Sequence, residues 1–175
     1  MSLVADVLLA TIKKTDLKFQ SPTWGEVSLS QMFTKTRDYI HSYPEGQYRL
    51  VVGSDSHPAV NGKDTIEYIT AFVIHRVGAG GIYFWHKTVG PKVFNLRDRI
   101  YTESLLSLQA AQILIEYFDK YNLLKFDLEI HADIGPSGKT REMITEVTGM
   151  IRGSGFKCLT KPDSYGASKV ADRHT

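Results

Sequence analysis

The stretch from Tyr48 to His57 reads Tyr-Arg-Leu-Val-Val-Gly-Ser-Asp-Ser-His, and the remainder of the chain can be arranged around it. It begins as a continuous apolar run, which is typical of a strand that is buried on both faces. Where the run stops, the carboxylate of Asp55 lies between two serines. A central strand that ends in an acid is a candidate active-site strand, although an aspartate here can also simply cap the following turn.

Composition limits the classes of protein to which the chain can belong. A length of 175 residues with 42% hydrophobic content suits one well-buried core, so we expect a domain over 46–175 after an N-terminal extension with a short helix over 1–45. A net charge of +2 means that any affinity for nucleic acid must come from local patches. The single cysteine, the lack of a signal peptide and the lack of a membrane span predict a cytoplasmic protein without membrane contact.

Hydrophobic periodicity and turn residues predict five strands with helices between them. A capping box at Ser28 to Gln31 starts a helix that stops before Tyr43, and Asn95 caps a long helix that ends near Tyr121. The first strand is expected to run from Tyr48 to the residue before Asp55, and the others at 65–76, 82–89, 126–132 and 156–160. Two more helices are expected at 143–152 and 167–173.

Connection lengths predict the order of the sheet. Short turns join the first three strands, which makes them antiparallel neighbours, whereas helical crossovers make the last two strands parallel to the first. The expected fold is therefore an α/β fold with a mixed five-stranded sheet and flanking helices. Ligands gather at the carboxyl ends of parallel strands, and Asp55, Asp133 and Asp163 all follow strands directly. Glu103 falls within the inward stripe of the long helix.

These four acids indicate a divalent-metal cluster. Like charges held close together repel strongly at low dielectric, so four carboxylates converge in a stable fold only when cations compensate them. Mg²⁺ or Mn²⁺ suits an all-oxygen ligand set, and two such ions about 3.5 to 4 Å apart can activate water and stabilise the leaving oxygen of a phosphodiester. Phosphodiester hydrolysis is therefore the expected reaction.

The order of these acids resembles that of the ribonuclease H-like fold, and separate blocks of sequence are similar to the YkuK-like family of predicted ribonuclease H-related nucleases. The blocks are Gly53-Ser-Asp-Ser56, Arg99-Ile-Tyr-Thr-Glu103, His131-Ala-Asp-Ile-Gly135, Lys139-Thr-Arg-Glu142 and Lys161-Pro-Asp-Ser-Tyr-Gly-Ala-Ser168. The resemblance covers nearly everything from about Phe19 onward.

The resemblance implies a two-metal carboxylate nuclease that acts on RNA, an RNA/DNA hybrid or structured DNA. It implies that Asp55, Glu103, Asp133 and Asp163 are catalytic metal ligands, with Asp172 on the terminal segment as an alternative fourth ligand.

A second motif, Gly135-Pro-Ser-Gly-Lys-Thr140, lies between a strand and a helix but has two residues between its glycines where a Walker loop has four. Its backbone amides, with Lys139 and Arg141, can instead hold one phosphate of a nucleic acid. A plain helix cap with solvated basic residues is the alternative.

The remaining candidates are side chains that support the acids or offer other ligands. His131 and Ser56 are candidates to hold the metal ligands in place, and His131 can also act as a general base. His57 with Asp55, and His131 with Asp133, could instead form the centre of a His/Asp metallohydrolase of small phosphoesters. Trp85 and its aromatic neighbours can stack bases or belong to the core. A catalytically silent module that binds nucleic acid or protein is the third function left open.

Overall fold

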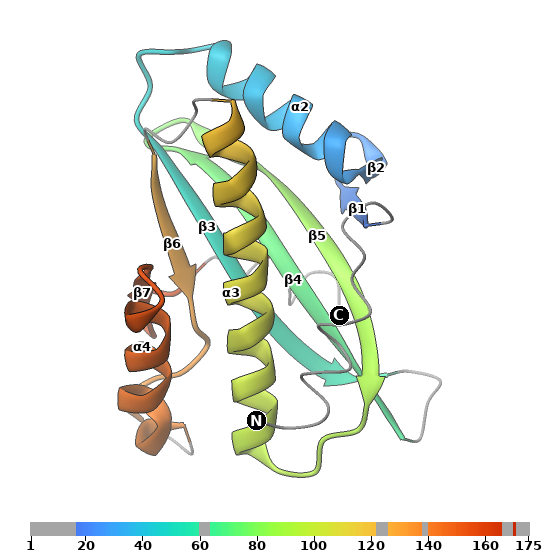
Figure 1. The fold of residues 1–175 in the computed structure, drawn as a ribbon, viewed down its shortest axis with the longest axis vertical. Helices are drawn as coiled ribbons and strands as arrows, with labels where there is room; N and C mark the ends of the chain where they lie inside the picture. Colours follow the sequence, from blue (N-terminus) through green and yellow to red (C-terminus); the bar gives the residue numbers. More distant parts are fainter. Residues whose placement is uncertain (1–16, 60–63, 122–125, 138–139, 166–169, 171–175) are drawn as a thin grey trace.

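The computed structural model describes residues 17–59, 64–121, 126–137, 140–165 and 170. Its elements follow one another along the chain as shown in Figure 1. They are β1 (Lys18–Ser21), β2 (Gly25–Ser28), α2 (Leu29–His41), β3 (Tyr48–Pro58), β4 (Thr65–Arg76), β5 (Gly80–Pro91), α3 (Leu96–Lys120), β6 (Asp127–His131), the 3₁₀ helix η1 (Arg141–Met143), α4 (Ile144–Gly153) and β7 (Lys157–Leu159).

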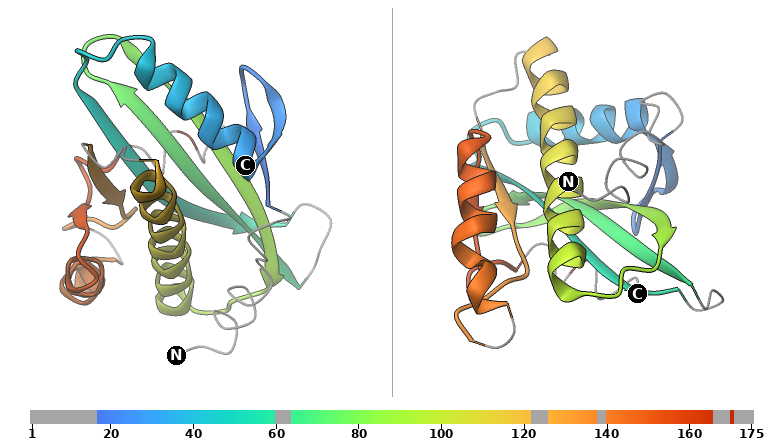
Figure 2. Two further views of the ribbon diagram at one scale, coloured as in Figure 1. Left: turned by 45° about the horizontal axis from the view of Figure 1, so that its top comes forward. Right: turned by 60° about the horizontal axis from the view of Figure 1, so that its bottom comes forward.

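The strands form one mixed sheet in the order β2-β1-β5-β4-β3-β6-β7. The long strands β3, β4 and β5 pair antiparallel, while β6 and β7 run parallel to β3. Helices α3 and α4 lie side by side over one face of this sheet (Figures 1 and 2). The predicted α/β fold, with three antiparallel strands followed by two parallel ones, is therefore confirmed.

The helices begin where the sequence predicts. Ser28 and Gln31 form the predicted capping box of α2, with each side chain accepting from the other residue's backbone N–H. The side chain of Asn95 accepts a hydrogen bond from the N–H of Asp98 at 2.7 Å and so caps α3. Both caps satisfy backbone donors that the first helical turn leaves without a partner within the helix.

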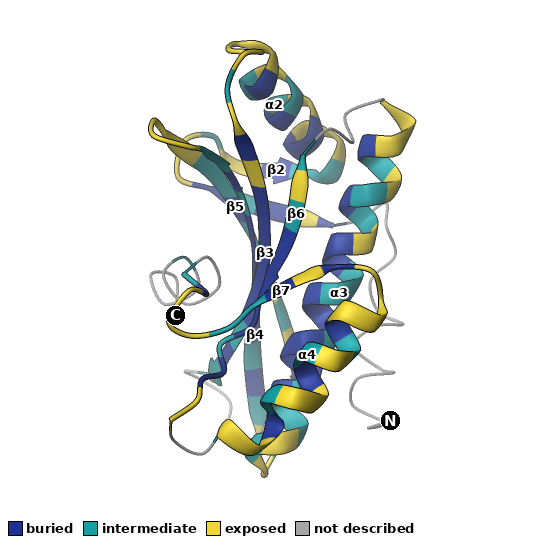
Figure 3. Cartoon of the chain, turned by 90° about the vertical axis from the view of Figure 1, so that its left-hand side faces the viewer, coloured by how far each residue is buried: buried dark blue, intermediate teal, exposed yellow. Residues whose placement is uncertain are grey.

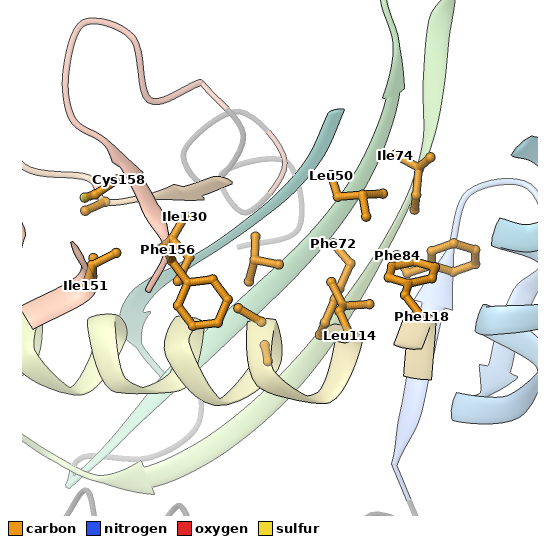
Figure 4. Packing of buried hydrophobic residues seen from close by; sticks show 14 of the residues in the cluster. Leu50, Phe72, Ile74, Phe84, Leu114, Phe118, Ile130, Ile151, Phe156 and Cys158 are labelled. Atoms are coloured by element: carbon orange, nitrogen blue, oxygen red, sulfur yellow. The ribbon is translucent and has the colours of Figure 1, made fainter. Parts of the chain in front are cut away.

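Alternation along β3 sends two sets of side chains to opposite faces of the sheet. Leu50 and Val52 belong to the core under α3, which also contains Phe72, Leu114 and Ile130 (Figure 4). Ser54 and Ser56 continue the same face toward the end of β3. Figure 3 shows that the buried positions of α3 and α4 face the sheet, whereas their outer faces are exposed.

The predicted count of five strands is wrong, because β1 and β2 add a hairpin to the edge of β5. The hairpin turns at residues 22–24, Gly25 follows with a left-handed φ of +67°, and Gln20 of β1 pairs with Trp85 of β5. Strands of four residues are too short for a recognisable alternation, so residues 21–26 read as a loop. The expected terminal helix over 167–173 lies outside the described residues, apart from residue 170.

Helix α2 packs against the end of α3 through stacked rings. The ring centroids of Phe33 and Tyr117 are 3.4 Å apart at an interplanar angle of 4°, and Phe118 meets Phe33 edge-on. The described part of the expected N-terminal extension therefore shares the core of the sheet domain, and the boundary at residue 45 stays a prediction. None of the described helices is long and apolar enough to cross a membrane.

We expect Phe33→Ala to lower the free energy of unfolding by about 3 to 5 kcal/mol, because it empties a fully buried ring site between α2 and α3. Phe94→Ala is the matched control, since the ring of Phe94 is 88% exposed and its loss should change stability by less than about 0.5 kcal/mol. Urea unfolding followed by circular dichroism measures both. Equal stability of the two variants would show that α2 is not an integral part of the domain.

Candidate metal centre

Asp55 and Asp133 reach the same level of the sheet on neighbouring strands. Val52 of β3 pairs with Ile130 of β6, and each acid lies three residues beyond its member of this pair. Strand β6 ends at His131, so Asp133 lies in the connection just past the end of its strand, as predicted. The prediction that Asp55 follows the end of its strand is wrong, because β3 continues to Pro58 by pairing with β4. Asp55 Oδ1 accepts a hydrogen bond from the N–H of Ser56 at 2.8 Å.

Glu103 approaches this edge from the middle of α3. Its side chain is buried, and its Oε1 accepts a hydrogen bond of 2.6 Å from Ser56 Oγ. Arg99, one turn earlier on α3, places its Nε 3.5 Å from the same oxygen. The predicted role of Ser56 as a side chain that supports an acid therefore has a concrete geometry, namely a short bond from β3 to the carboxyl of Glu103.

A row of small hydroxyl side chains fixes α3 against the sheet at this point. Ser107 Oγ donates to Glu103 O at 2.9 Å and to Ser54 Oγ at 3.0 Å, and Ser54 Oγ lies 2.9 Å from Thr70 Oγ1. A buried polar group destabilises the fold unless it is hydrogen-bonded. Because these hydroxyls bond to one another, they fix the spacing between α3, β3 and β4. The position of Glu103 follows from that spacing.

Burial and nearby charges shift the pKa of Glu103. Burial is the largest cause that raises the pKa of Glu103, to about 8, and the negative charges of Asp55 and Asp133 raise it further. The hydrogen bond from Ser56 and the charge of Arg99 act in the opposite direction but do not cancel these effects. In the metal-free protein Glu103 therefore holds a proton at neutral pH.

Asp133 is paired with Lys161, which the sequence did not single out. Lys161 Nζ lies 2.9 Å from Oδ1 and 3.0 Å from Oδ2, and the contact with Oδ2 has the geometry of a hydrogen bond. Within the described residues the buried Oδ1 has no hydrogen-bond partner, so its contact with Lys161 is electrostatic. Neither the lysine nor Arg99 was predicted, although both lie inside the family-like blocks and Arg99 precedes Glu103 by one helical turn.

The fourth acid does not join the other three among the described contacts. Asp163 lies exposed in the turn after β7, and it is absent from the charges that shift the pKa of Glu103. Asp172, the alternative, and Lys139 lie outside the described residues. Arg141 is exposed at the start of η1, just after a loop that is closed by a 3.2 Å hydrogen bond from the N–H of Gly135 to Thr140 Oγ1.

The two histidines have carboxylate partners other than the predicted ones. His131 is fully buried, and its Nε2 lies 3.3 Å from Glu129 Oε2, whose other oxygen binds Lys157 Nζ. Burial lowers the pKa of His131 despite Glu129, so the ring is neutral at pH 7. His57 lies 3.2 Å from Glu67, which also pairs with Lys87 at 2.7 Å. His57 is half-buried.

The donor set fits a hard divalent cation. Asp55, Glu103 and Asp133 offer oxygen ligands, and one carboxylate oxygen of Asp133 is buried without a hydrogen bond from the described residues. As the side chains stand, no three described His, Cys, Asp or Glu residues are close enough together to hold one ion. The described acids therefore do not converge on a common point.

Comparison with known proteins assigns the fold to a family. The profile of the family described as Ribonuclease H-like matches residues 31–175. The uncharacterized protein YkuK of Bacillus subtilis (strain 168) is 29% identical over 171 residues, which cover 90% of this chain and 96% of YkuK.

Among solved structures, endonuclease V of Ciona intestinalis, crystallised with a 24mer DNA containing an inosine followed by a ribo-adenosine, aligns with a TM-score of 0.41 and 10% identity. The alignment covers 83% of this chain and 65% of the endonuclease chain. The family profile covers most of the sheet and all the predicted acids, and the match to YkuK spans nearly the whole chain. The chain belongs to the ribonuclease H-like family and, within it, to the YkuK-like proteins.

Proposed function

We propose that the protein is a divalent-metal-dependent nuclease that hydrolyses phosphodiester bonds of RNA or DNA. The observation that carries this proposal is the buried carboxyl of Glu103, whose pKa is raised by burial and by the negative charges of Asp55 on β3 and Asp133 just past β6. A buried carboxyl whose pKa is shifted this far by burial and like charges is characteristic of functional sites. Family membership supports the reaction class, since the fold is that of ribonuclease H-like proteins.

Asp55, Glu103 and Asp133 are the proposed ligands of Mg²⁺ or Mn²⁺. When bound, the metal would supply an activated water and stabilise the oxygen that leaves phosphorus. Glu103 has to lose its proton to act as a ligand, and Ser56 keeps its Oε1 fixed while it does so. Asp163 remains the proposed fourth acid, with Asp172 as the alternative.

Basic side chains around the acids are suited to hold the substrate. Arg99 contacts Glu103, Lys161 contacts Asp133, and Arg141 is exposed beyond the loop that follows Asp133. Phosphate contacts of this kind position a nucleic acid without reading its sequence. With Lys139, which we propose for the same role, these residues make RNA, an RNA/DNA hybrid or structured DNA the proposed partner.

A catalytically silent module that binds nucleic acid or protein is the second candidate. The contact between Lys161 and Asp133 favours it, because an ammonium already compensates one of the acids. The third candidate, a His/Asp metallohydrolase, is disfavoured because His57 and His131 have Glu67 and Glu129 as partners.

We expect Asp55→Asn to reduce metal-dependent cleavage by roughly 100-fold or more, because replacing even a residue that supports a metal ligand typically costs 10- to 100-fold. The assay incubates the purified protein with Mg²⁺ or Mn²⁺ and single-stranded RNA, an RNA/DNA hybrid, duplex DNA and branched DNA. Asp38→Asn is the matched control, since this aspartate is exposed on α2 beside Arg37. Cleavage that survives in Asp55→Asn would exclude the proposed site, and a wild-type protein that cuts none of the substrates would favour the silent module.

Glu103→Gln should change how the stability of the metal-free protein depends on pH. The folded wild type keeps a proton that the unfolded chain releases near pH 4.5, so wild-type stability falls as the pH rises from about 4.5 to about 8 and then levels off. Glutamine still accepts the hydrogen bond from Ser56 but has no proton to release on unfolding. The free energy of unfolding of the variant should therefore rise relative to that of wild type by on the order of 4 kcal/mol between pH 5 and pH 8. Urea unfolding with EDTA at both pH values measures the difference.

The same variant should lose most of the thermal stabilisation that Mn²⁺ gives the wild type at pH 8, since a ligand bound only by the folded state raises its stability. An unchanged pH profile together with an undiminished Mn²⁺ shift would contradict both the proton on Glu103 and its role as a ligand.

A further inference from the structure

Lys161 is held so that its ammonium meets Asp133. Its backbone N–H donates to Ile134 O at 2.8 Å, which fixes the turn after β7 to the connection after β6. Its stem packs against Gly135, where an added Cβ would lie 3.0 Å from Lys161 Cβ. A glycine at position 135 therefore lets the lysine stem approach, and the contact between Lys161 and Asp133 is a built feature of the fold.

The ammonium and a divalent ion require the same oxygens. Lysine has three donors and no acceptor, so its charge can compensate a carboxylate but cannot share the oxygen lone pairs with a metal without repulsion. We propose that Lys161 is the resident counter-ion of Asp133, which the metal must displace, and that this residue thereby sets the metal affinity of the site. The inference rests on the proposed function in that it takes Asp133 as a ligand.

The chain supplies a matched control in Lys157. Both lysines lie at or just after β7, their side chains are 53% and 56% exposed, and each pairs with one carboxylate that follows or belongs to β6. The partner of Lys157 is Glu129, four residues before Asp133, which is about 13 Å along an extended chain. Removing either charge changes the net charge equally, but only Lys161 contacts the proposed ligand.

The test is isothermal titration of Mn²⁺ into metal-free wild type, Lys161→Met, Lys161→Arg and Lys157→Met at low ionic strength. Methionine keeps the stem that packs on Gly135 and removes the charge. Lys161→Met should bind Mn²⁺ about 5- to 10-fold more tightly than wild type, whereas Lys157→Met and Lys161→Arg should stay within about twofold of it.

Two results would overturn the role of Lys161. Affinity in Lys161→Met equal to or weaker than that in Lys157→Met, with wild type still binding, would sink this inference alone and leave the proposed function standing. Absence of Mn²⁺ binding in every variant would refute both. Binding that appears only in Lys161→Met would support the inference in its strongest form.

A separate observation concerns the loop that leads into α3. Phe94 is 88% exposed, while the other large exposed apolar side chains of the described residues are between 42% and 54% exposed. Lys92 Nζ lies 5.6 Å from the centroid of the Phe94 ring. The loop is anchored on both sides, by the N–H of Lys92 bonded to Asp64 O at 2.9 Å and by the cap that Asn95 forms with Asp98.

The loop that carries Phe94 leads directly into α3, the helix that carries Glu103. The tips of β3 and β5 and the start of α3 lie together toward the lower end of Figure 1. Glu103 lies seven residues beyond Leu96, the first residue of α3, which is about 10 Å along the helix axis. A nucleic-acid base can stack on an exposed aromatic ring, and a neighbouring ammonium can bind the phosphate of the same nucleotide. Such stacking requires a base that is not paired with another strand.

We infer that Phe94 and Lys92 form a stacking platform for an unpaired base of a nucleic acid bound at the site. The proposed function supplies only the class of ligand here, because stacking itself needs no cleavage. Tyr121 is the matched control, since Lys120 lies 5.7 Å from its ring centroid at the opposite end of α3 and the side chain is 43% exposed.

Fluorescence anisotropy with EDTA compares binding of a labelled 20-nucleotide single strand and of the matching duplex. Phe94→Ala should weaken binding of the single strand by about tenfold and leave the duplex within twofold, while Phe94→Trp should retain binding and Tyr121→Ala should resemble wild type. Equal losses for Phe94→Ala and Tyr121→Ala, or no binding of the single strand by wild type, would overturn the inference. A dimer in sedimentation that Phe94→Ala dissociates would identify a protein interface and overturn it as well.

Discussion

The hydrogen bond from Ser56 Oγ to Glu103 Oε1 is the interaction on which the candidate site depends. It joins the central strand to the long helix inside the protein, where a carboxyl group without a partner would be strongly destabilising. The row of hydroxyls from Thr70 to Ser107 continues the same contact toward the core. Because these side chains are small, α3 can lie close to β3, and the carboxyl of Glu103 meets Ser56 near the end of that strand.

The balance of charge at that edge is incomplete in the metal-free protein. Asp133 has Lys161 and Glu103 has Arg99, yet the pKa of Glu103 remains raised because burial outweighs the help of the arginine and the serine. The protein therefore compensates part of the negative charge with its own cations and keeps one acid protonated. Such an arrangement limits the repulsion between the acids.

Much of the fold and part of the site can be predicted from sequence. Features marked by a local pattern of residues were predicted, whereas the individual side-chain pairs of the site were not. Local signals such as the capping box at Ser28 and the cap at Asn95 placed α2 and α3, and the predicted topology placed Asp55 and Asp133 on or just past the neighbouring strands β3 and β6, with Glu103 on α3. The β1–β2 hairpin was missed because its strands are too short to show a period. The pairs of Lys161 with Asp133 and of His131 with Glu129 depend on loop geometry and side-chain direction. Hydrophobic periodicity does not predict either of these.

The described sheet has long strands at its centre and short ones at both ends. Strands β3, β4 and β5 have 11 or 12 residues, whereas β2 has four and β7 has three. An edge strand presents unpaired backbone groups that can recruit a strand from another chain, and short edges offer few of them. Growth of the sheet by addition of strands is therefore poorly supported, and any self-association of this protein would have to use side-chain surfaces.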